Sequence, residues 1–192
     1  MKQKSRIFNT LFTFVASLFL LSACGDSAAL TENTQDIEKI ITDKFGQDLH
    51  FTEFRISNGK GPRGKVVSSM GMTLTTDPSS LEAESWNYSD GNWEQISEVT
   101  LEMSGDAKPE DFMLSLDELA LPKLQEMINH AKTHLTKEKN IENPFVTSLS
   151  ISTPNRAPKN ESQFLIFLQP ENGGTSFNLS YTLEGEFKEM DY

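Results

Sequence analysis

Cysteine is almost absent from this sequence of 192 residues, which contains only Cys24. A single cysteine excludes an internal disulfide, a zinc site built from several cysteines and a Cys-x-x-Cys redox motif. Basic residues are also scarce, with 17 lysines and arginines against 28 acidic residues and a net charge of −11. Because nucleic-acid binding proteins carry basic surfaces, this composition argues against a nucleic-acid partner.

A long apolar run is lacking as well. The most apolar stretch, residues 7–21, is interrupted by polar residues and is too short to span a bilayer. It follows three basic residues, Lys2, Lys4 and Arg6, and it ends in the small residues Ser22 and Ala23. A basic start, a short apolar run and a small-residue end are typical of an export signal.

The four residues Leu21-Ser22-Ala23-Cys24 resemble the lipobox of bacterial lipoproteins. The resemblance implies that residues 1–23 are a signal peptide and that acyl chains such as palmitate are attached to Cys24. Several acyl chains on one residue anchor a protein stably to a membrane. In this family an aspartate after the cysteine favours the inner membrane; Gly25 follows here, so we expect the outer membrane, facing the periplasm.

The domain that remains after export is strongly acidic. Removing 23 residues with three positive charges from the chain leaves 169 residues with a net charge of −14. Anionic head groups repel such a domain, so we expect it to stand off the bilayer on a lipidated tether, residues 24–33.

The next part of the sequence predicts one helix and four strands. Apolar residues recur at helical spacing from Ile37 to Phe45, and Gly46 follows, which predicts a helix over 34–45. Alternating and β-branched patterns predict strands at 49–56, 66–74 and 81–88, and a strand from 93 to 103 with a bulge near Ser97. Asp90-Gly91 predicts the last hairpin turn.

The second half of the sequence predicts the same order of helix and strands. After a connector, 106–120, an apolar stripe predicts a helix that starts at Leu121 and ends at Asn143-Pro144. Strands are predicted at 145–152, 163–168 and 176–183, with a last strand through Phe187. We therefore predict an α+β fold in which residues 34–105 and 121–192 are tandem repeats of one helix packed on a four-stranded antiparallel meander. Matching positions differ by 94 or 95, although two similar meanders can also arise by chance.

Residues 34–192 resemble, in element order, the tandem modules of PepSY-like periplasmic proteins and the plan of β-lactamase inhibitor proteins. The likeness is carried by an aromatic, turn glycine, aromatic pattern that occurs twice: Trp86, Gly91, Trp93 and Tyr181, Gly185, Phe187. It implies a protein-binding or accessory module and identifies no site residue. The inhibitor proteins also carry disulfides that this chain cannot form.

The same aromatic residues, with Tyr88, are the first candidates for binding. Pairs of rings beside a tight turn commonly stabilise a hairpin. Rings that face outward would instead make an anchor for a protein partner, and the candidates are Trp86, Tyr88, Trp93, Tyr181 and Phe187.

The loop from Gly59 to Lys65 is the densest basic cluster. Its glycines nearly match a phosphate loop, but a strand pattern follows where a helix is needed, so no nucleotide is expected. Lys60 and Arg63 could receive an acidic partner, and the alternative is a solvated turn.

His130 and His134 lie one turn apart on the second predicted helix, a spacing that could grip a metal ion. Only two ligands are evident, so a polar helix flank is the alternative, and no cofactor or metal is expected. The sequence thus favours a membrane-anchored, non-enzymatic protein-binding or inhibitor-like lipoprotein. The alternatives are an envelope-assembly or structural lipoprotein and a metal-dependent hydrolase using these histidines and nearby acids.

Overall fold

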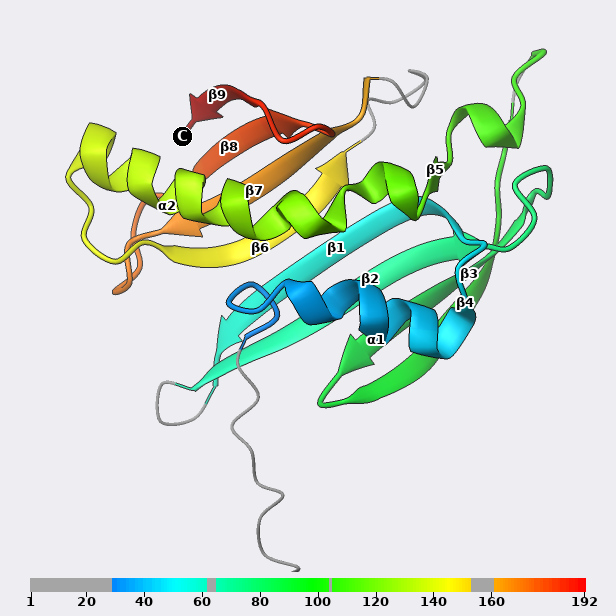
Figure 1. The fold of residues 1–192 in the computed structure, drawn as a ribbon, viewed down its shortest axis with the longest axis horizontal. Helices are drawn as coiled ribbons and strands as arrows, with labels where there is room; N and C mark the ends of the chain where they lie inside the picture. The colour runs from blue at the N-terminus through cyan, green and yellow to red at the C-terminus, as the bar shows by residue number, and fades with distance from the viewer. Residues whose placement is uncertain (1–28, 62–64, 104, 153–160) are drawn as a thin grey trace, which may run out of the picture.

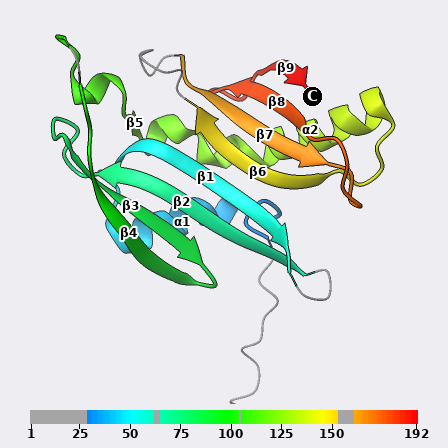
Figure 2. The ribbon, with the colours of Figure 1, turned by 180° about the vertical axis from the view of Figure 1, so that it is seen from behind.

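The computed structural model describes residues 29–61, 65–103, 105–152 and 161–192. They form one nine-stranded antiparallel sheet in the order β4-β3-β2-β1-β6-β7-β8-β9, with the short strand β5 paired to β1. Both α-helices cover the same face of the sheet (Figure 1), and the view from behind shows the other face without a helix (Figure 2). The predicted α+β class is therefore confirmed.

The first helix and its four strands lie close to their predicted positions. α1 spans Gln35–Phe45, buries Ile37 and Ile41, and ends where Gly46 adopts a positive φ of 86°. β1 (His50–Lys60), β2 (Val66–Thr75), β3 (Glu82–Ser89) and β4 (Asn92–Thr100) follow. Asp90 and Gly91 both have positive φ, as the two-residue hairpin turn requires. The β3–β4 register shifts beside Ile96, next to the bulge predicted near Ser97.

The connector between β4 and α2 contains structure that the sequence did not predict. It forms three short 3-10 helices, η2 (Pro109–Asp111), η3 (Asp117–Leu119) and η4 (Leu121–Lys123), and the two-residue strand β5 (Leu114–Ser115). β5 pairs with the start of β1, at Phe51 and His50. The connector is thus bound to the sheet by backbone hydrogen bonds.

The second helix and its strands complete the sheet. α2 (Leu124–Lys139) buries the predicted apolar stripe, but it ends four residues before Asn143, because Asn140 turns the chain in a left-handed conformation. β6 (Phe145–Ser152), β7 (Gln163–Gln169), β8 (Phe177–Thr182) and β9 (Phe187–Asp191) follow. No helix in the described ranges is long and apolar enough to cross a membrane.

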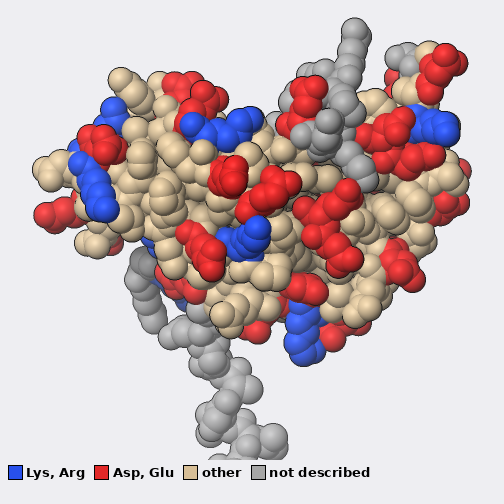
Figure 3. Space-filling model, turned by 45° about the horizontal axis from the view of Figure 1, so that its top comes forward, with Lys and Arg blue, Asp and Glu red and all other residues tan. Residues whose placement is uncertain are grey.

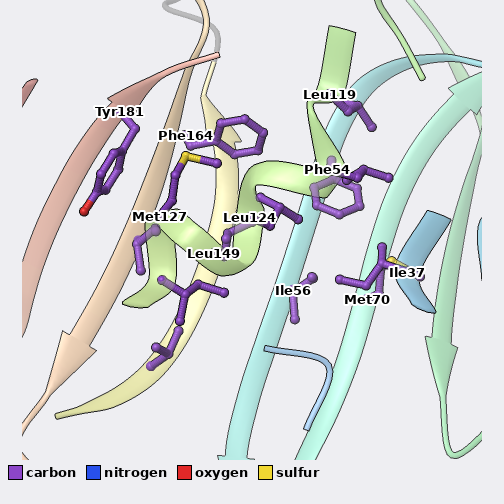
Figure 4. Packing of buried hydrophobic residues seen from close by; sticks show 14 of the residues in the cluster. Ile37, Phe54, Ile56, Met70, Leu119, Leu124, Met127, Leu149, Phe164 and Tyr181 are labelled. Carbon is purple, nitrogen blue, oxygen red and sulfur yellow. The ribbon is translucent and has the colours of Figure 1, made fainter. Parts of the chain in front are cut away.

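The two halves share one sheet and one core. β1 pairs with β6 at the centre of the sheet, where Ile56 lies opposite Leu149. Phe54 and Phe164, from opposite halves, are both 1% exposed or less and belong to one apolar cluster with residues of both helices (Figure 4). We therefore expect the described domain to unfold as a single unit.

Candidate functional site

The aromatic residues of the β3–β4 hairpin lie on the helix-covered side of the sheet. The ring of Phe45, at the end of α1, meets Trp86 and Trp93 edge-on, with centroids 5.2 and 5.0 Å apart. Tyr88 lies 5.0 Å from Trp93, and all three strand residues are partly buried against the core. This arrangement agrees with the hairpin-stabilising alternative.

The structure brings together the candidates of the second half. Tyr181 is buried, and its hydroxyl lies 2.9 Å from Nδ1 of His130. The ring of Phe187 packs against His130 and His134, at centroid distances of 5.3 and 4.8 Å. Periodicity placed the histidines and the aromatic residues on separate elements, and only the packing of α2 over β8 and β9 makes them neighbours.

Burial within this cluster shifts the pKa of two of its side chains, Tyr181 and His130. Burial raises the pKa of Tyr181, so its hydroxyl stays protonated and can donate to Nδ1 of His130. Partial burial of the imidazole, then the charges of His134 and Lys137, lower the pKa of His130. No group of three potential metal ligands lies together anywhere among the described residues.

The lowered pKa of His130 predicts a stability that depends on pH. The unfolded chain takes up a proton near the ordinary pKa of about 6.5, before folded His130 does. The free energy of unfolding should therefore fall as the pH decreases through 6.5 toward the lower pKa of the folded state. Urea unfolding between pH 5 and 8 should show that His130→Gln loses this pH-dependent decrease in the free energy of unfolding. Thr133→Ala, on the same helix, should keep it. Identical profiles for the wild type and His130→Gln would contradict the assignment.

Lys60, at the end of β1, does not lie near the aromatic candidates. Its Nζ donates to the carbonyl oxygen of Glu171 in the β7–β8 loop and lies 5.6 Å from the centroid of Phe145. The groove beside it is lined by Lys60, Lys132 and Lys137 together with Glu32, Glu142 and Glu171. Arg63 and Cys24 lie outside the described residues.

The connector side of the molecule is acidic. A hollow of about 1120 Å³ lies between η3, η4 and the β8–β9 turn, and its wall includes Asp117, Glu118 and Glu184. Acidic side chains gather over the connector and the start of α2 (Figure 3). Hydrogen bonds from its own backbone and from Thr182 lower the pKa of Glu184, the reverse of what a general acid needs.

The helix-free face of the sheet was not identified as a site from the sequence. Cross-strand partners point to the same side, so the register assigns to this face the residues that alternate with the core. Most of them are small and polar: Ser57, Ser69, Gly71, Thr73, Ser85, Asn87, Ser89, Ser148, Ser150, Asn178 and Ser180. The signal was present in the sequence as serine, threonine or asparagine at every second position of several strands.

Part of this face has hydrogen-bonding groups without partners. Oδ1 of Asn178 and Oγ of Ser180 are buried, and neither has a hydrogen bond within the part of the chain that the structure describes. By register they neighbour Phe167 and Leu165, which are partly exposed. Leaving a buried polar group unpaired costs about 1 to 3 kcal/mol. Both oxygens are buried, so the exposed contacts at this place come from their neighbours Phe167 and Leu165.

Comparison of the chain with protein-family models, with curated proteins and with solved structures finds no match.

Proposed function

We propose that the chain is an exported lipoprotein, anchored through Cys24 to the outer membrane on its periplasmic side, and that its helix-free sheet face binds another protein. The observation that carries the binding proposal is this face itself, a broad surface that neither helix covers (Figure 2). Export and anchoring rest on the lipobox, which lies outside the described residues.

The chemistry of the face supports a protein partner rather than a reaction. Serine, threonine and asparagine side chains offer both donors and acceptors, and their small size leaves the backbone close to an incoming surface. Phe167 and Leu165, which are partly exposed, pair with Ser148 and Ser150, so this face offers polar and apolar contacts next to one another. Protein interfaces combine the same two elements.

We also infer that the domain arose by duplication of a helix packed on a four-stranded meander. β1 skips Thr52 in its pairing with β2, and β6 skips Thr147 in its pairing with β7, an offset of 95. Arg55 pairs with Ser150, which also differ by 95. When a residue pairs with its own counterpart, a two-fold axis passes between them, so these two residue pairs support one relationship between the halves.

Crosslinking in native membranes tests the binding proposal. Ser69→Arg, beside Ser57 and Ser89, and Ser148→Arg, beside Ser57 and Phe167, each place a long charged side chain on the helix-free face. We expect recovery of the dominant crosslinked protein to fall about tenfold or more, as for a central interface residue. The same substitution on exposed Thr136 of α2 is the matched control and should leave recovery unchanged.

The result separates the possible roles of the face. Equal recovery with Ser69→Arg, Ser148→Arg and the wild type, all with similar melting temperatures, would rule out binding through this face. No crosslinked protein above background would argue against a protein partner altogether. A partner from the membrane-assembly machinery would favour the structural role over an inhibitor-like one.

A further inference from the structure

We propose that one end of the sheet faces the membrane, with Lys60 and Lys65 toward the phospholipid head groups. This hairpin end is where β1 finishes at Lys60, β2 begins at Val66 and the described chain begins at Ala29. The opposite, connector end then points into the aqueous space. The inference rests on the proposed lipidation of Cys24 and specifies how the anchored domain is oriented.

The tether is too short to let the domain turn freely. Five Cα to Cα steps separate Cys24 from Ala29, and an extended chain covers at most about 18 Å over that length. The sheet is far longer than this reach, because β1 alone has 11 residues, or about 36 Å. Whichever end carries Ala29 must therefore stay near the bilayer.

Hydrogen bonds hold the start of the described chain on the hairpin end. The backbone N–H of Leu30 donates to Oγ of Ser68 in β2, at 3.1 Å. Nδ2 of Asn58 in β1 donates to Oγ1 of Thr31, at 2.6 Å, and to the carbonyl oxygen of Val146, at 2.9 Å. Ala29 and Thr31 are both buried, so this attachment is part of the packed domain.

The two ends also differ in charge. The loop from Gly59 to Lys65 contains three basic residues and no acidic one, and the groove beside it is lined by three lysines and three glutamates. The connector, residues 101–123, contains six acidic residues and two lysines. An anionic membrane surface therefore repels the connector end more strongly than the hairpin end. The connector thus carries a net charge of −4, at the end that a tethered domain holds farthest from the lipid.

This orientation has a consequence for the helix-free face. The strands run from the hairpin end to the connector end, so a domain standing on its hairpin end presents the face sideways. The face then remains open to partners in the aqueous space or beside the anchored chain, and it is not pressed against the lipid.

Lysine labelling of the full-length lipidated protein tests the orientation with its native residues. The protein is reconstituted into vesicles of phosphatidylethanolamine and phosphatidylglycerol, acetylated briefly with a water-soluble reagent and compared by mass spectrometry with the lipid-free chain. Labelling of Lys60 and Lys65 should fall about threefold or more, because these two lysines approach the membrane surface within a Debye length. Labelling of Lys44 and Lys108, toward the connector end, should stay within about 1.5-fold. Equal protection at both ends, or stronger protection of Lys108, would overturn the proposal.

A longer tether provides the matched control. Inserting twelve glycine and serine residues between Ser27 and Ala28 adds a flexible reach of about 20 Å. At high salt the difference in lysine protection between the two ends should then disappear. The longer tether lets the domain turn, and the salt screens the charges that would orient it. A difference that persists in this variant would show that the tether does not set the orientation.

The intact mass of the protein separates this inference from the proposed function. An unmodified Cys24 would contradict lipidation, and coupling its thiol to a maleimide lipid would then still test the orientation on the same vesicles. A lipidated Cys24 with equal protection at both ends would leave the anchor in place and reject the orientation alone.

Discussion

Replacing Phe54 or Phe164 with alanine is expected to lower the free energy of unfolding by about 3 to 5 kcal/mol in each case. Phe54 lies on β1 and Phe164 on β7, and their side chains are 1% and 0% exposed. Each substitution removes buried apolar surface and leaves a cavity that the packed neighbours fill only in part. For a domain of this size the melting temperature should fall by roughly 6 to 20 °C.

The two substitutions also test whether the halves form one cooperative unit. Because β1 and β6 join them into one sheet, both variants should retain a single unfolding transition at a lower temperature. Scanning calorimetry and circular dichroism would measure it. Ile96→Ala, at a side chain that is 58% exposed on the edge strand β4, is the control and should change stability by less than about 0.5 kcal/mol. Two separated transitions, with only one shifted in each variant, would contradict a shared core.

Substitution of Cys24 by serine should abolish lipid attachment completely. A serine hydroxyl cannot take the place of the thiol that carries the lipid in the lipoprotein family which residues 21–24 resemble. Each buried methylene of an acyl chain contributes about 0.8 kcal/mol to membrane binding, so the loss of several chains removes stable anchoring.

Incorporation of labelled palmitate and partition into a detergent phase measure this loss. We expect the wild type to carry the label and to enter the detergent phase, and Cys24→Ser to carry no label. Ser27→Ala changes a nearby residue of the tether and should behave as the wild type. Label on Cys24→Ser, or none on the wild type, would contradict the lipobox interpretation. Palmitate is the better readout, since an uncleaved signal peptide can itself hold the variant on the membrane.

Local periodicity was sufficient to predict the two helices and the eight longer strands. The apolar residues of α1 and α2 recur every three or four positions, and the hairpin turn at Asp90-Gly91 carries the residues that positive φ requires. β5 was missed because a strand of two residues has no periodicity, and its pairing with β1 depends on contacts made across the fold.

The site could be predicted less well than the fold. Periodicity does not specify which strands of two meanders meet, so the Ile56–Leu149 pairing at the centre had no local signal. The same limit applies to His130 and Tyr181, which are 51 positions apart and meet only when α2 packs on the sheet. The candidate rings were chosen for their size, and the sequence alone did not determine which face they occupy.

The irregular register of the edge hairpins bears on how anchored copies behave when crowded on a membrane. β4 and β9 are the two open edges of the sheet, and each lies in a hairpin interrupted by a register shift. The exposed Glu94 and Glu98 of β4 and Lys188 and Glu189 of β9 add charge along these edges. Bulged and charged edges are poor templates for another strand. Lipid anchoring concentrates copies in two dimensions, and these edges disfavour their growth into a continuous intermolecular sheet.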